Sequence, residues 1–149
     1  RHKGCSVVEM LQNCVIFNHG IHNFITDKEN RADRTIHLVH GEKMIFGKEM
    51  NKGIVQDGFA LKAVEIGKDG YTIDDVLTHD AKCADTTLHT MLAAMKYPEY
   101  PVAVGVIRDV DDENVYDVKV AEQVEQVKAS AKIKCVDDLL RSGQTWEIK

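Results

Sequence analysis

The run from Val102 to Ile107 constrains the fold more than any other stretch of this chain. Its six residues are apolar or glycine, whichever way they would face along a strand. A strand with one face in water alternates polar and apolar side chains, whereas a strand of a parallel or mixed α/β sheet is covered on both faces. The run therefore predicts an α/β fold in which this strand lies between two layers.

Other short segments carry strand or loop signals. Val7–Leu11 is a brief apolar run with β-branched residues and predicts a buried strand. Ile36–Val39 and Met44–Phe46 flank a Gly-Glu pair, which predicts a hairpin. Leu61–Ile66 alternates weakly and predicts another strand. In contrast, Lys48–Phe59 has two glycines and little periodicity, so we expect a surface loop there.

Helices are expected mainly in the second half of the chain. Thr72 and Asp75 are spaced as in a capping box and predict the start of a short helix, and Asp85 can cap the next one. Asn18–Arg34 is polar and predicts a loop with one or two helical turns, and Val136–Arg141 predicts a short last helix. Two apolar stripes at helical spacing are Leu88, Met91, Leu92 and Met95, then Val120, Val124, Val127 and Ala131.

Composition excludes several classes of function. A net charge of −5 without a basic patch disfavours nucleic-acid binding. No run approaches the roughly 20 apolar residues of a membrane helix, and no secretory signal is visible. The chain begins at Arg1 instead of methionine, so we expect a part of a longer protein. The four cysteines, which contain no C-x-x-C pair and suggest a reducing cytoplasm, are Cys5, Cys14, Cys83 and Cys135.

Cys14 is the residue with the clearest chemical potential. It follows the expected strand Val7–Leu11, and open α/β sheets place their ligands at the carboxyl ends of strands. A thiolate in that place can ligate iron or zinc, although a cysteine can also be a small core residue. His19 and His22 provide a rival arrangement, a small zinc site with Cys14, but the spacing C-x4-H-x2-H is not a standard zinc pattern.

The pair His79-Asp80 is chemically suggestive but isolated. The two side chains permit general-base chemistry, yet no serine or cysteine nucleophile lies close in the sequence. A histidine and an aspartate that hold a loop at a helix end are the simpler interpretation. The chain contains neither G-x-G-x-x-G nor a phosphate-binding loop, so we expect no catalytic residue within it.

Several motifs occur in one order along the chain. The first combines His2-Lys3-Gly4, an apolar run, Gln12-Asn13-Cys14 and Phe17-Asn18. The later ones are Thr26–Glu29, His40–Lys48, Lys52–Ile54, Asp57–Phe59, His79-Asp80, Pro98–Arg108 and Ser142–Glu147. Together they resemble the β subunit of 2-oxoacid:ferredoxin oxidoreductases, most closely the 2-oxoglutarate type. That family often has proline beside the cysteine, where this chain has Asn13 and Val15.

The resemblance implies a fold and a division of the chain. It implies the carboxyl-terminal half of the β subunit, with part of a thiamine-diphosphate-binding-type sheet, flanking helices and a carboxyl-terminal extension. Residues 1–35 would end the thiamine-diphosphate-binding domain and carry the cluster-ligand turn, and residues 36–149 would form the carboxyl-terminal region. By the resemblance, Cys14 is the fourth ligand of an iron–sulfur cluster.

The resemblance also implies an activity and partners. The complete enzyme would convert a 2-oxoacid, here 2-oxoglutarate, to acyl-CoA with thiamine diphosphate, magnesium, a [4Fe-4S] cluster and coenzyme A. Electrons would pass to ferredoxin, and the α subunit would be a partner. The family's thiamine diphosphate motif, Gly-Asp-Gly, is absent from these 149 residues. We therefore expect the isolated chain to bind no cofactor, to be inactive and to self-associate.

Two alternatives remain open at this point. One is a non-catalytic interaction module, and the other is a small zinc-binding domain that uses Cys14, His19 and His22.

Overall fold

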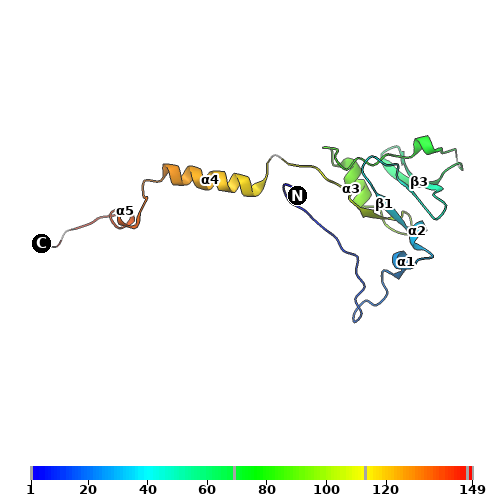
Figure 1. Ribbon diagram of the computed structural model, residues 1–149, viewed down its shortest axis with the longest axis horizontal. Coiled ribbons are helices and arrows are strands. Elements are labelled where there is room, and N and C mark those ends of the chain that lie inside the picture. The colour runs from blue at the N-terminus through cyan, green and yellow to red at the C-terminus, as the bar shows by residue number, and fades with distance from the viewer. Residues whose placement is uncertain (1, 69, 113, 147, 149) are drawn as a thin grey trace. The chain divides into compact units, whose positions relative to one another are not determined.

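The structure is a computed structural model that describes residues 2–68, 70–112, 114–146 and 148. It divides the chain into two compact units, one formed by Val8–Val110 and the other by Arg1–Val7 with Asp111–Lys149. The larger unit contains a parallel sheet, an antiparallel sheet and short helices (Figure 1). The expected α/β fold class is therefore confirmed.

The parallel sheet of the larger unit has two strands. Strand β1 (Thr35–Leu38) pairs with β5 (Val102–Gly105), and Leu38 lies opposite Gly105. Gly105 has φ of +101°, and a Cβ added to it would come within 2.6 Å of the Leu38 carbonyl oxygen. Only glycine suits that position. The parallel strand predicted at 102–107 is confirmed, but its cover is incomplete, because β5 is half-buried and Val106 is exposed.

The predicted hairpin between residues 36 and 46 is wrong. The turn itself exists, since the Glu42 N–H donates to the Val39 carbonyl oxygen at 3.1 Å. However, β1 pairs in parallel with the distant β5, while β2 (Ile45–Phe46) joins a separate antiparallel sheet. Local turn chemistry predicts the reversal of the chain, but the partner of each strand is decided by long-range packing.

The surface loop predicted at 48–59 is also wrong. Strand β3 (Lys52–Asp57) occupies it and lies between β2 and β4 (Ala60–Glu65), which confirms the strand predicted at 61–66. Gly53 allows close packing there, because a Cβ on it would lie 2.6 Å from a methyl group of Val76. A glycine that weakens the local strand signal thus marks a close approach inside the sheet.

Helix α3 (Thr87–Ala93) covers the sheets through the predicted stripe. Leu92 is buried, and Leu88, Met91 and Met95 pack partly buried against the same core. The Asp85 carboxylate accepts the Thr87 N–H at 2.7 Å, but Asp85 lies one residue before the N-cap, Thr86, so it is not the cap that the sequence predicted. The buried residues of this core are Ile36, Leu38, Met44, Phe46, Ile54, Leu61 and Leu92.

The other predicted helices are confirmed. The Asp75 carboxylate accepts the Thr72 N–H at 2.7 Å. This bond caps the start of the 3₁₀ helix η1 (Ile73–Asp75). In the second unit, α4 (Tyr116–Ser130) and α5 (Val136–Leu140) form, and apolar side chains of α4 such as Val118 and Val127 are exposed. No helix in the described part of the chain is long and apolar enough to cross a membrane.

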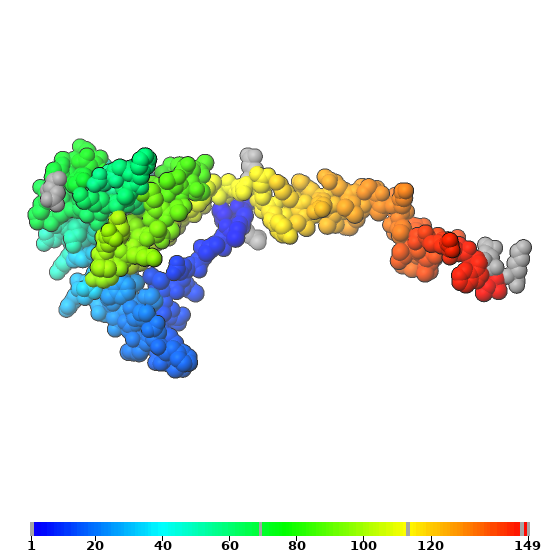
Figure 2. All heavy atoms as spheres, turned by 180° about the vertical axis from the view of Figure 1, so that it is seen from behind, coloured from blue at the N-terminus to red at the C-terminus, as the bar shows by residue number. Residues whose placement is uncertain are grey.

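The strand predicted at Val7–Leu11 is absent. Val7 and Val8 are 89% and 82% exposed, and Cys5, which precedes them, is exposed as well. An extended segment becomes a strand only beside a neighbour that satisfies its amides, and the described residues supply none here. Within the larger unit, Figure 2 shows the blue stretch that begins at residue 8 extending away from the strands of that unit. The short helices α1 (Asn23–Thr26) and α2 (Arg31–Arg34) confirm the prediction for 18–34.

Candidate functional site

Cys14 lies in a tight turn with its thiol in solvent. The Asn18 N–H donates to the Cys14 carbonyl oxygen at 3.2 Å, and the two residues form an isolated antiparallel bridge. The Phe17 N–H donates to Sγ of Cys14 at 3.4 Å. The turn therefore aims a backbone donor at the sulfur while leaving the sulfur accessible.

The turn favours the thiolate form of Cys14. Hydrogen bonding from the Phe17 amide, followed by that from the Ile16 amide, holds the pKa of the Cys14 thiol below its usual value. A thiolate is the form that ligates metals and reacts as a nucleophile. The apolar side chains beside it, Val15, Ile16 and Phe17, are all exposed. The local chemistry thus suits a metal-ligating thiolate on a surface that another part of the protein would cover.

Asn13 ties this turn to helix α1. Its Oδ1 accepts the His22 N–H at 2.8 Å, and its Nδ2 donates to Oδ1 of Asn23 at 3.1 Å. In the sequence, Asn13 is notable only as a departure from the proline that the resembled family often has beside the cysteine. Its role is visible only once the chain folds back, because the partner amide lies nine residues away.

The zinc site proposed from Cys14, His19 and His22 is not assembled. Across the described ranges, no three histidine, cysteine or acidic side chains gather closely enough to hold a metal ion. His22 belongs to the start of α1 and has its Nδ1 buried without a partner among the described residues, while His19 is exposed. Cys14 can therefore supply one ligand of a site, and this region does not complete a site with it.

The pair His79-Asp80 is not at a helix end, as expected, but at the carboxyl edge of the parallel sheet. His79 is fully buried, and its Nε2 lies 2.9 Å from the Val106 carbonyl oxygen, so Nε2 carries the proton. Its backbone binds the loop after β1, because its N–H donates to the Glu42 oxygen and its oxygen accepts the Gly41 N–H, each at 2.8 Å. The expected function of holding a loop fits this geometry.

Asp80 is engaged with groups other than the His79 ring. Its Oδ1 accepts the Lys82 N–H at 2.9 Å and lies 3.3 Å from Nδ1 of His40. In a catalytic triad the carboxylate binds the histidine ring and orients it. The bonds of the His79-Asp80 pair are therefore those of a structural joint.

Two residues that the sequence analysis missed complete this joint. Nε2 of His89, a ring that is 4% exposed, donates to the Asp80 carbonyl oxygen at 2.8 Å, and Nδ1 accepts from Nη1 of Arg108 at 2.9 Å. The same guanidinium donates to the carbonyl oxygens of Cys83 and Ala84. His89 lies three residues before the buried Leu92, a helical spacing that could have placed it on the buried face of α3. Arg108 follows the apolar run 102–107 and carries no such signal.

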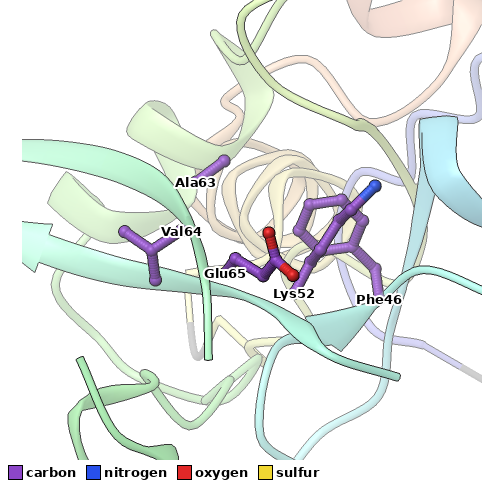
Figure 3. A pocket seen from close by; sticks show the side chains of 5 residues that line it. All are labelled: Phe46, Lys52, Ala63, Val64 and Glu65. Carbon is purple, nitrogen blue, oxygen red and sulfur yellow. The ribbon is translucent and has the colours of Figure 1, made fainter. Parts of the chain in front are cut away.

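A hollow of about 200 Å³ lies on the antiparallel sheet between Phe46 and Glu65 (Figure 3). Its charged side chains already have partners: Lys52 pairs with Asp33 at 2.7 Å, and Glu65 pairs with Lys68 at 2.7 Å. The Lys52 ammonium also lowers the pKa of the Asp33 carboxyl. We assign no ligand to this hollow, and Cys14 remains the candidate site.

Comparisons with known proteins agree with the motifs. The chain is 28% identical over 151 residues to the 2-oxoglutarate oxidoreductase subunit KorB of Mycobacterium tuberculosis strain H37Rv, an alignment that includes 99% of this chain. It spans 39% of the length of that relative. No protein-family model and no solved structure matches the chain. The chain is thus similar along nearly its whole length to a subunit of a 2-oxoglutarate oxidoreductase, which confirms the family resemblance of its motifs.

Proposed function

We propose that the chain is the carboxyl-terminal part of the β subunit of a 2-oxoacid:ferredoxin oxidoreductase that acts on 2-oxoglutarate. The observation that carries the proposal is the similarity to a 2-oxoglutarate oxidoreductase subunit over 99% of this chain. The exposed Cys14 thiol, which accepts an amide hydrogen bond, supports a metal-ligating role at the position that the motifs indicate. The complete enzyme would form acyl-CoA by oxidative decarboxylation.

The residues of the Cys14 turn fit one corner of an iron–sulfur cluster. Cluster irons are held by cysteine thiolates, and N–H groups directed at sulfur stabilise the added electron of the reduced state. Cys14 would supply one thiolate, and Phe17 would supply such an N–H group. The remaining ligands would come from outside the residues described here. Bound there, the cluster would supply one-electron transfer toward ferredoxin.

The proposal extends to the other parts of the enzyme. Thiamine diphosphate, magnesium and coenzyme A would act in the complete enzyme, with the α subunit and ferredoxin as protein partners in the cytoplasm. Residues 1–35 would end the thiamine-diphosphate-binding domain, and residues 36–149 would form the carboxyl-terminal region. The 149-residue chain by itself would bind no thiamine diphosphate and show no turnover.

The substrate assay tests this proposal directly. The complete enzyme, purified with its partner subunit, is incubated with coenzyme A, ferredoxin and either 2-oxoglutarate or pyruvate. We expect reduction of ferredoxin that depends on coenzyme A and is faster with 2-oxoglutarate. A preference for pyruvate would reject the substrate assignment, and no reduction with any 2-oxoacid would reject the enzyme class.

The alternative of a non-catalytic interaction module is favoured by one observation, the exposed apolar side chains of α4. Apolar residues left uncovered on a helix are typical of a protein contact. The same assay separates the two proposals, because a module would contribute no 2-oxoacid-dependent reduction.

A further inference from the structure

We infer that Asn13 is a positioning residue that holds the Cys14 turn in its ligand-bearing conformation. The inference rests on the proposed function, in which Cys14 ligates an iron–sulfur cluster. Asn13 would touch neither substrate nor cluster in this role. It would act through the backbone of the turn.

The carboxamide of Asn13 closes a loop that contains Cys14. It accepts from the backbone of His22 at 2.8 Å and donates to the side chain of Asn23 at 3.1 Å, so it uses both its acceptor and its donor. The loop between these contacts contains the turn at Cys14–Asn18 and the left-handed Gly20, with φ of +73°. A short side chain that makes two such bonds fixes a loop without a proline.

We call the two bonds of Asn13, to His22 and to Asn23, the clamp. Its far end, helix α1, is attached to the body of the larger unit. Ile25 of α1 is buried, and the Arg34 guanidinium donates to the Phe24 carbonyl oxygen at 3.2 Å. The rings of Phe24 and Tyr97 lie 5.0 Å apart. Asn13 is therefore the link through which a fixed helix orients an otherwise exposed turn.

The near end of the clamp is adjacent to the sulfur. Asn13 precedes Cys14 in the chain, and the Phe17 N–H that donates to Sγ belongs to the same turn. If the clamp is lost, this N–H samples other directions and its bond to sulfur weakens. Because that bond favours the more negative, reduced state of a cluster, its loss should lower the reduction potential.

The experiment compares four variants of the complete enzyme. Asn13→Ala removes both bonds, and Asn23→Ala removes only the weaker one. Asn30→Ala is the matched control, because Asn30 begins α2 with no side-chain capping bond. Cys14→Ala tests the ligand itself. Each is measured for iron per subunit, for cluster reduction potential by EPR-monitored titration, and for deuterium uptake of the peptide that spans residues 11–22.

The clamp predicts a graded result. Asn13→Ala should shift the potential to more negative values and speed deuterium uptake in residues 11–22. Asn23→Ala should do both to a smaller extent, and Asn30→Ala should match the wild type. Loss of iron in Asn13→Ala alone among the three asparagine variants would also support the clamp.

The outcomes separate the clamp from the proposed function. If Cys14→Ala loses iron while Asn13→Ala keeps the wild-type potential and uptake, the clamp is rejected and the ligand assignment stands. If Cys14→Ala retains a normal cluster, the ligand assignment is rejected, and the clamp has no role in this function.

Discussion

Nη1 of Arg108 lies 2.9 Å from Nδ1 of the buried His89 ring. The same arginine donates to the carbonyl oxygens of Cys83 and Ala84, so it joins the end of the 102–107 run to the segment before α3. Arg108→Met should therefore lower the free energy of unfolding by about 1–3 kcal/mol, the cost of leaving the buried Nδ1 of His89 without its donor. Urea unfolding followed by circular dichroism measures this change.

The control is Arg141→Met in the second unit, because Arg141 is an exposed arginine that lies outside the joint at His89. It should unfold within about 0.5 kcal/mol of the wild type, as surface substitutions usually do. Equal effects of the two substitutions would mean that the joint at His89 does not stabilise the larger unit.

The second prediction concerns a substitution of Gly105. Alanine there would need a left-handed backbone and would place Cβ within 2.6 Å of the Leu38 carbonyl oxygen, so the β1–β5 pair must shift. Backbone strain of this kind costs on the order of 1–3 kcal/mol, and the close contact adds to it. Gly143→Ala is the control, since nothing lies within 4 Å of the added Cβ. A thermal midpoint of Gly105→Ala equal to that of the control would contradict the register of the parallel pair.

Cys14 should be the more reactive of two exposed thiols near the start of the chain. Amide hydrogen bonds lower the pKa of its thiol, so a larger fraction is thiolate at pH 7. Iodoacetamide should label Cys14 faster than Cys5, as measured by mass spectrometry of peptides over time. In Asn13→Ala the rate at Cys14 should fall toward that of Cys5. Equal rates in the wild type would mean that the turn does not hold its donors on the sulfur in solution.

The 149-residue chain should self-associate. Exposed apolar side chains on α4 and among residues 7–17 are typical of surfaces that another protein element covers. Light scattering over a concentration series should show a mass that rises with concentration, and Val124→Lys with Val127→Lys should reduce it. A strictly monomeric chain that unfolds cooperatively would show that these surfaces tolerate water.

Local patterns in the sequence predicted what depends on local chemistry. The α3 stripe of Leu88, Met91 and Leu92 forms as expected, because helical spacing places these side chains on one face. The Thr72–Asp75 box also forms, because its two partners lie three residues apart. The class of the fold followed from the run at 102–107. In each case the physical cause is contained in one short segment.

Features that depend on long-range contacts could not be predicted from local sequence patterns. β1 pairs with a strand more than 60 positions away, so no turn signal at Gly41 could reveal it. Gly53 weakens the strand signal at the point where the fold needs a close approach to Val76. At the candidate site, the family motif indicated Cys14, whereas the clamp between Asn13 and His22 appears only when the chain folds back.

The most direct test of the account is the iron content of the complete subunit when Cys14 is replaced. Cys14→Ser and Cys5→Ser are compared, since both residues are exposed cysteines near the start of the chain. The account predicts that Cys14→Ser loses iron and the EPR signal of one cluster, while Cys5→Ser keeps both. A normal iron content and an intact, reducible cluster in Cys14→Ser would contradict the assignment of Cys14 as a ligand.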